Sequence, residues 1–138
     1  MEAQKEIAVI IPTYKAHDTI CYTPMSIAIQ KAASFKVYVV IDGEEPGSYD
    51  YLKDYLGLDI EILYNPVNGG CGVARQYGID RTTEPFYCFI DADDTFVSSL
   101  ALYYQHEPFK EKKTAMVSCD FLQENEDHSI RLRERDMV

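Results

Sequence analysis

The chain is 138 residues long, and 46% of its residues are hydrophobic and 26% are charged. This length and composition are typical of one globular domain and exclude a disordered chain, a collagen and a pure coiled coil. The 13 Lys and Arg residues against 23 Asp and Glu residues give a formal net charge of -10. Such an acidic protein does not hold nucleic acid or an anionic lipid surface through a general positive field, so any phosphate must be held by local groups.

The apolar runs are short, as in Ile7–Ile11, whereas a membrane span needs roughly 18 apolar residues. The amino terminus lacks the cationic start and apolar stretch of a secretory signal. We therefore expect no membrane span and a cytoplasmic location. The four cysteines form no Cys-x-x-Cys pair, which argues against a zinc site, and Cys88 and Cys119 are expected to be buried thiols.

Short β-rich runs alternate with helical segments, the pattern of an α/β domain with a mainly parallel sheet flanked by helices. The strands are mostly near-continuous apolar runs, as expected of strands covered on both faces. In chain order, the five predicted strands are Glu6–Ile11, Lys36–Ile41, Asp59–Tyr64, Phe86–Ile90 and Thr114–Asp120.

Four helices are predicted between these strands. Thr23 caps the first, which should end near Ser34. The second and third are predicted over 48–56 and 73–80, and the fourth over 95 to about 105, with Asp94 or Thr95 as its cap.

The residues after Asp120 change to a pattern typical of a hairpin, with a polar turn over 124–127, and we expect this hairpin at the sheet edge. The chain shows no repeat and no linker rich in Pro, Gly or Ser. Residues 1–138 are therefore expected to form one domain.

Ligands of open α/β sheets bind beyond the carboxyl ends of the strands, so the residues that follow the strands are the candidates for function. After the fourth strand, three carboxylates stand in four positions over Asp91–Asp94. Such carboxylates repel one another unless a cation or hydrogen-bond donors compensate, and hard oxygen ligands suit Mg²⁺ or Mn²⁺. Asp91 and Asp93 are the predicted ligands. An acidic helix cap is the alternative interpretation.

A glycine-rich loop, Asn68–Gly72, follows the third strand and could bring backbone amides close to a phosphate. An ordinary flexible turn explains it as well, because the loop lacks the ending of a P-loop. Arg75 stands one turn into the next helix, where the helix dipole does not favour a cation. A phosphate or a carboxylate partner is therefore expected for it. The alternative interpretation is an ordinary surface arginine. Tyr14 either stacks on a base or packs under the sheet edge.

Four segments in the same order resemble the amino-terminal part of the family-2 glycosyltransferases, enzymes with the GT-A fold that use nucleotide-sugars. The first three are similar to the family's opening strand and turn, its first helix, and its third loop and helix, and the fourth is similar to its Asp-x-Asp motif. In chain order, these segments are Val9–Tyr14, Ser26–Gln30, Asn68–Ile79 and Phe89–Asp94.

The resemblance implies a sugar transfer, of inverting type, from a metal-bound nucleoside-diphosphate sugar, a UDP-sugar first among them, to an unknown acceptor. It also implies that Mn²⁺ or Mg²⁺ and the diphosphate are held by Asp91 and Asp93. The residues that it implies for the nucleotide are Pro12, Thr13, Tyr14, Asp42, Gly70, Arg75, Asp91 and Ala92.

The chain departs from the family's pattern in two places. Where the family usually has Asp-Asp-Gly-Ser, this chain has Ile41–Glu44, so one of two acidic residues is missing. In inverting members the general base lies well downstream of the Asp-x-Asp motif, and only 44 residues follow Asp94. No residue is predicted as the base, and most of the acceptor-binding half is expected to lie in a further segment, in a partner or in a second copy.

Two classes of function remain open on this basis. The first is a glycosyltransferase domain, and the second is a nucleotide-sugar-binding or regulatory module without turnover. A metal-dependent nucleotidyltransferase fits poorly, because no glycine-rich loop follows the first strand, and a phosphoacceptor receiver fits poorly, because no acidic residues follow it.

Overall fold

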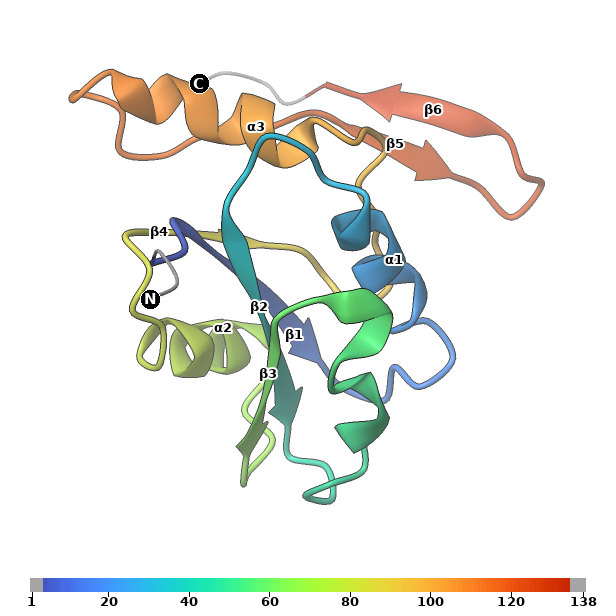
Figure 1. The fold of residues 1–138 in the computed structure, drawn as a ribbon. Helices are drawn as coiled ribbons and strands as arrows, with labels where there is room; N and C mark the ends of the chain where they lie inside the picture. Colours follow the sequence, from blue (N-terminus) through green and yellow to red (C-terminus); the bar gives the residue numbers. More distant parts are fainter. Residues whose placement is uncertain (1–3, 135–138) are drawn as a thin grey trace.

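A four-stranded parallel sheet forms the centre of the molecule, in a computed structural model that describes residues 4–134 (Figure 1). The strand order is β3-β2-β1-β4, and the four predicted strands before Thr114 are confirmed to within two residues. Their bounds are Ile7–Thr13 for β1, Phe35–Asp42 for β2, Ile60–Asn65 for β3 and Phe86–Phe89 for β4.

Helices cover both faces of this sheet, so the two central strands carry side chains that are buried on both sides. On one face, α2 (Cys71–Ile79) packs through Ala74 against Ile10 of β1 and its neighbours. The other face is covered by α1 (Tyr22–Ala28), by two short 3₁₀ turns and by α3 (Ala101–His106). The three 3₁₀ turns of the described chain are η1 (Asp50–Leu52), η2 (Tyr55–Gly57) and η3 (Glu107–Lys110).

The third predicted helix is confirmed as α2, whereas the first two are wrong in part. The first helix ends at Ala28 rather than near Ser34, and Thr23 lies inside it, where its hydroxyl donates a hydrogen bond of 2.7 Å to the carbonyl of Asp94. The second is replaced by η1 and η2. Asp54 and Leu56 both adopt positive φ, which interrupts a helix.

The fourth helix begins at Ala101, not at Thr95, so neither Asp94 nor Thr95 caps it. The side chain of Ser26 in α1 and that of Gln30, just after α1, hydrogen-bond to backbone groups over 96–98 that would otherwise pair within a helix. The Phe96 N–H donates to the Ser26 hydroxyl at 3.1 Å, and the Gln30 amide donates to the Ser98 carbonyl at 2.7 Å. This tertiary hydrogen bonding overrides the local preference for helix.

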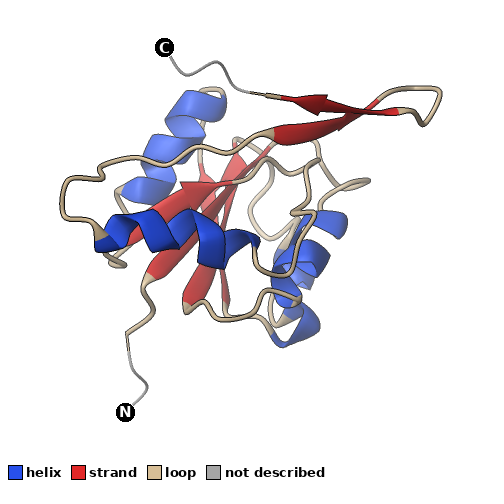
Figure 2. Cartoon of the chain, turned by 90° about the horizontal axis from the view of Figure 1, so that it is seen from above, coloured by secondary structure: helices blue, strands red, loops and turns tan. Residues whose placement is uncertain are grey.

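The fifth predicted strand, Thr114–Asp120, is wrong. The segment runs along α3 in both views rather than along the free edge of β4 (Figures 1 and 2), and it therefore finds no strand to pair with. The hairpin after Asp120 is confirmed as β5 (Phe121–Glu124) and β6 (Ile130–Arg133), which pair antiparallel. It forms a sheet of its own and does not join the edge of the main sheet.

Within the described residues, no helix has the length and apolar character that crossing a membrane requires.

Candidate functional site

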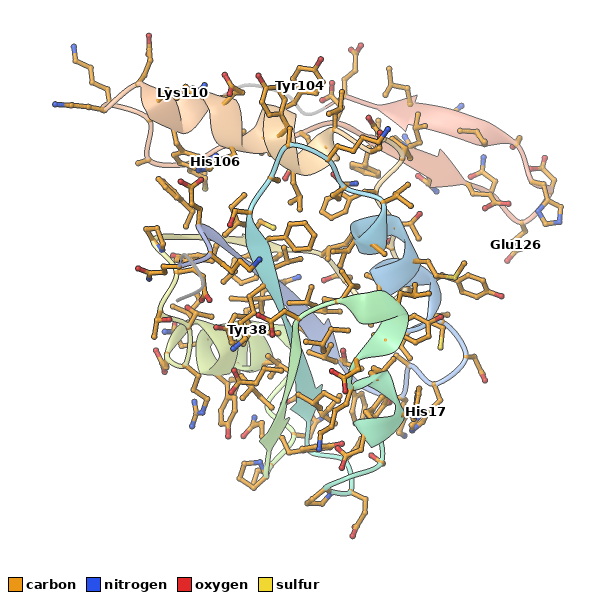
Figure 3. The ribbon with its side chains drawn as sticks, in the orientation of Figure 1. His17, Tyr38, Tyr104, His106, Lys110 and Glu126 are labelled. Carbon is orange, nitrogen blue, oxygen red and sulfur yellow. The ribbon has the colours of Figure 1, made fainter. Side chains whose placement is uncertain are left out.

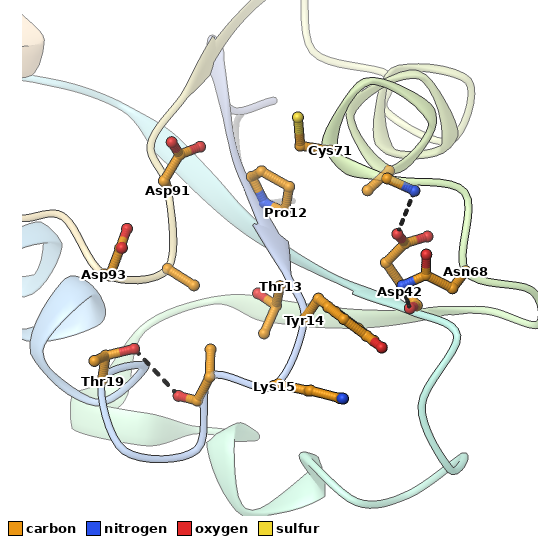
Figure 4. Close-up of a pocket in the computed structure, with 14 residues that line it drawn as sticks. Pro12, Thr13, Tyr14, Lys15, Thr19, Asp42, Asn68, Cys71, Asp91 and Asp93 are labelled. Atoms are coloured by element: carbon orange, nitrogen blue, oxygen red, sulfur yellow. Dashed lines mark hydrogen bonds between the residues drawn. The ribbon is translucent and has the colours of Figure 1, made fainter.

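A pocket of about 500 Å³ opens at the carboxyl ends of β1, β2 and β4 (Figure 4). This is the edge at which the sequence places the candidate residues, because parallel strands end together. Of the nine candidates, Arg75 alone does not line the pocket. The eight candidates that line the pocket are Pro12, Thr13, Tyr14, Asp42, Gly70, Asp91, Ala92 and Asp93.

The Asp42 carboxylate holds the glycine-rich loop against the end of β2. Its side chain is almost fully buried and accepts hydrogen bonds from the Gly70 N–H at 2.8 Å, the Gly69 N–H at 3.1 Å and the Asn65 amide at 3.0 Å. Two of the amides that the sequence offered to a phosphate are thus bound to Asp42. The resulting anchor fixes where the loop enters α2.

A close backbone approach secures the same loop from the other side. Gly43 has φ +83, and a Cβ there would collide with the backbone of Asn68. The Asn68 amide in turn donates to the Asp42 carbonyl at 3.1 Å. A residue with a side chain at position 43 therefore has neither the space nor the favourable backbone conformation.

Asp91 and Asp93 line the opposite side of the pocket, and Asp94 forms a cluster of three carboxylates with them. Carboxylate oxygens of Asp91, Asp93 and Asp94 lie within 4.8 Å of one another. Asp94 turns back on Asp91 through a 3.0 Å backbone hydrogen bond. Burial raises the pKa of Asp94, and the negative charges of Asp93 and Asp91 raise it further. Like charges at this separation favour a bound cation, and three hard oxygen donors fit Mg²⁺ or Mn²⁺.

Arg75 reaches this carboxylate cluster from α2. Its guanidinium donates a hydrogen bond of 2.9 Å to one oxygen of Asp91 and lies 5.6 Å from the centre of the Phe89 ring. A carboxylate partner is one of the two explanations expected for a cation at this position, and the geometry shows it. The other oxygen of Asp91 has no hydrogen bond to Arg75.

The turn after β1 forms the wall between these two sides (Figure 4). Thr13 is buried, and its hydroxyl donates back to the Ile11 carbonyl at 3.0 Å. Tyr14 is 50% exposed, so it does not pack under the sheet edge. The Lys15 ammonium lies 5.3 Å from the centre of the Tyr14 ring. Tyr14 is therefore free to meet a ligand.

Six lining residues are not among the predicted site residues, and they are Lys15, Ala16, Thr19, Asn68, Cys71 and Ala74. Asn68 and Cys71 belong to the glycine-rich loop that was considered for a phosphate, and Lys15, Cys71 and Ala74 each stand next to a predicted site residue. Asp94 was recognised among the three carboxylates but not predicted as a ligand, and it joins their cluster. The prediction that Cys119 is buried is also wrong, because Cys119 lies in the unpaired segment 114–120 and is exposed.

Comparison with known proteins gives a family and a fold. The model of the family described as "Glycosyl transferase family 2" matches residues 8–136. Among curated relatives, the glycosyltransferase TuaG of Bacillus subtilis, named for teichuronic acid biosynthesis, is 32% identical over 90 residues, which are 64% of this chain and 36% of TuaG. The uncharacterized glycosyltransferase EpsJ of the same organism is 27% identical over 88% of this chain and 35% of its own length. This chain spans about a third of the length of these two relatives.

The solved structures point the same way. A crystal structure of residues 1–349 of TarS from S. aureus, in complex with UDP-GlcNAc, superposes with a TM-score of 0.67 and 25% identity. The match covers 77% of this chain and 31% of the TarS chain.

Proposed function

This chain belongs to glycosyl transferase family 2 and has a GT-A fold, and from this we propose that it binds a nucleoside-diphosphate sugar together with a divalent cation. In this proposal it is the donor-binding part of a glycosyltransferase. The observation that carries the proposal is the pocket, which brings together candidate residues from the ends of three strands and faces them with a cluster of carboxylates.

We assign the two sides of the pocket different tasks. Tyr14, Thr13 and Asp42 lie on the side proposed for the nucleoside, and Asp91 and Asp93 on the side proposed for the diphosphate and Mn²⁺ or Mg²⁺ (Figure 4). A UDP-sugar is the first donor to test, since TarS is solved in complex with UDP-GlcNAc.

The cation would neutralise the charge that develops on the departing nucleoside diphosphate. The chain's own residues do the positioning. Arg75 holds Asp91 through its 2.9 Å ion pair, which orients the carboxylate toward the pocket. Asp42 keeps the glycine-rich loop in place, so that the pocket is formed before a ligand arrives.

The acceptor site is proposed to lie outside these residues. Among residues 4–134, the acidic side chains after Asp94 do not line the pocket, and those of the hairpin turn, Glu126 and Asp127 among them, are exposed. We therefore propose no general base. The match covers 36% of TuaG and 35% of EpsJ, and the acceptor half is expected in the part of the family's length that this chain does not match.

Calorimetric titration with UDP and GDP, with and without Mn²⁺, tests the proposal. We expect binding that requires Mn²⁺ and that weakens about tenfold or more in Asp93→Asn, because a charge-assisted ligand is lost. Asp59→Asn is the matched control, since Asp59 is exposed and lies at the opposite end of the sheet. Absence of heat with every nucleotide would overturn the proposal.

A binding module without turnover is the second candidate, and the absence of a candidate base among the pocket residues of the described chain favours it. Incubation of the chain with UDP-sugars separates the two. Sugar transfer or slow hydrolysis that disappears in Asp93→Asn identifies an enzyme, whereas Mn²⁺-dependent binding without any turnover identifies a module.

A further inference from the structure

We propose that Glu44 is a positioning residue for the donor: together with Tyr49 it holds the Tyr14–Ala16 turn in the shape that closes one side of the pocket. This inference rests on the proposed function, because the turn lines the pocket assigned to the nucleotide. Glu44 itself does not line the pocket, so it acts through the turn.

Four polar groups form the connection between the loop after β2 and the turn after β1. The Lys15 N–H donates to Glu44 Oε2 at 3.0 Å, and the Tyr49 hydroxyl donates to the same oxygen at 2.8 Å. The Ala16 N–H donates to the Tyr49 hydroxyl at 3.1 Å. Two successive amides of the turn are thus bound, one directly and one through Tyr49, to a single carboxylate oxygen.

The turn needs such a support because its backbone is unfavourable on its own. Lys15 has φ +49, a region that residues with side chains adopt only when the surroundings enforce it. Tyr14 and Lys15 are both exposed, so burial of their side chains does not hold the turn.

The other end of the connection is rigid. Tyr49 is fully buried, and its N–H donates to the Tyr64 hydroxyl at 2.9 Å. The His17 ring, which lies beside η1 (Figure 3), stacks on the Tyr49 ring with centroids 3.9 Å apart and an interplanar angle of 8°. The half-buried Glu44 therefore joins a strained turn to a fixed anchor.

Glu44 also stands at a position where this chain departs from the motif of the family it belongs to, which usually has serine there. A serine hydroxyl oxygen lies two bonds closer to the backbone than the carboxylate oxygens of Glu44. The hydrogen bond between the Glu44 carboxylate and the turn therefore depends on the residue by which this chain departs from the motif. The structural role of that residue is to hold the turn.

Amide exchange and nucleotide binding together test the proposal. In Glu44→Ala we expect the Lys15 and Ala16 amides, followed by NMR, to exchange about tenfold faster or more, and the Kd for UDP with Mn²⁺ to rise about tenfold, as for the loss of a polar contact. Glu44→Gln keeps an oxygen acceptor and should restore both values. Glu45→Ala is the matched control, because Glu45 is the exposed neighbour and makes no side-chain hydrogen bond that holds the turn.

The outcomes separate this inference from the function on which it rests. Unchanged exchange in Glu44→Ala overturns it whatever the wild-type chain binds, and faster exchange with unchanged Kd overturns it as well. A wild-type chain that binds neither UDP nor GDP contradicts the proposed function, and the positioning role then falls with it. A loss of binding in Glu44→Ala that Glu44→Gln does not rescue also contradicts the role.

Discussion

Gly78 shows how closely α2 lies on the sheet behind the pocket. A Cβ at this position would come within 2.8 Å of Ile10 Cγ2 and 3.1 Å of Val40 Cγ2. Both partners are fully buried on the central strands and cannot move aside. The absence of a side chain therefore lets the helix that follows the glycine-rich loop approach β1 and β2. This sets the position of Cys71 at the pocket and of Arg75 beside Asp91.

Gly78→Ala is predicted to destabilise the fold although alanine favours helix. The gain in helix propensity is at most about 1 kcal/mol, and overpacking costs about 1–3 kcal/mol, so we expect a net loss of about 1–2 kcal/mol. Urea unfolding measures it. Gly72→Ala in the same helix is the control, since a Cβ there meets nothing within 4 Å; equal effects of the two substitutions would contradict the packing argument.

Cys71 gives a chemical reporter inside the pocket. Its thiol is exposed and lines the pocket, and Cys119 is exposed elsewhere. Burial raises the pKa of Cys88 to about 12, so its thiol stays protonated. With iodoacetamide at pH 8, mass spectrometry should find Cys71 and Cys119 modified well before Cys88. UDP with Mn²⁺ should slow modification of Cys71 alone, and equal protection of Cys119 would argue against binding in this pocket.

At the scale of elements, the strands were predictable and several helices were not. Apolar runs such as Val37–Ile41 define a buried strand without help from distant residues, and β2 is where they place it. The start of α3 depends instead on hydrogen bonds that the Phe96 and Leu102 N–H groups donate to the side chains of Ser26 and Gln30, which are far away in sequence. The strand predicted over 114–120 did not form because it had no partner strand. The local sequence pattern does not indicate whether a partner strand lies nearby.

The same distinction applies to the pocket. Its members were found because they follow strands, which is a local signal. Their roles come from partners across the fold: Asp42 anchors the Gly69 and Gly70 amides, and Arg75 pairs with Asp91. The support that Glu44 gives to the turn after β1 was invisible for the same reason, because it joins residues 29 positions apart.

The β5–β6 hairpin is predicted to add little to the stability of the main sheet. All eight of its strand residues are exposed, and its strands pair only with each other. Isolated two-stranded hairpins are marginal in water. A chain truncated after Asp120 should therefore melt within about 3 °C of the 138-residue chain, a difference below about 1 kcal/mol. A drop of 10 °C in differential scanning calorimetry would show that the hairpin supports the core.

For the whole molecule, buried phenols should limit stability at alkaline pH. Burial raises the pKa of Tyr49 to about 12, the Ala16 N–H acts against this, and the hydrogen bond to Glu44 adds to it; burial likewise raises the pKa of Tyr38. An unfolded tyrosine ionises near pH 10. The unfolded chain thus loses protons first as the pH rises, so the stability that is present below pH 10 is progressively lost above it.

Urea unfolding between pH 8 and pH 11 measures this loss. The free energy of unfolding should begin to fall above about pH 8.5, where the Cys88 thiol of the unfolded chain ionises, and should fall more steeply beyond pH 10, where the phenols ionise. Tyr49→Phe should flatten the alkaline decline, and Tyr104→Phe, at an exposed tyrosine, should not. A decline that is equally steep in both variants would show that other groups cause it.

The excess of acidic residues affects nucleotide binding most strongly at the pocket. A net charge of -10 opposes binding of a free nucleoside diphosphate, and the cluster of Asp91, Asp93 and Asp94 makes the repulsion strongest where the diphosphate is proposed to lie. A bound divalent cation would offset this charge, so the charge distribution of the chain supports the proposed requirement for metal.

A crystal structure of the chain with UDP and Mn²⁺ tests this central claim most directly. We expect an anomalous manganese signal beside Asp91 and Asp93, with the diphosphate against it and the uridine near Tyr14. A manganese signal elsewhere with an empty pocket, or UDP bound in the pocket without metal, would contradict the account.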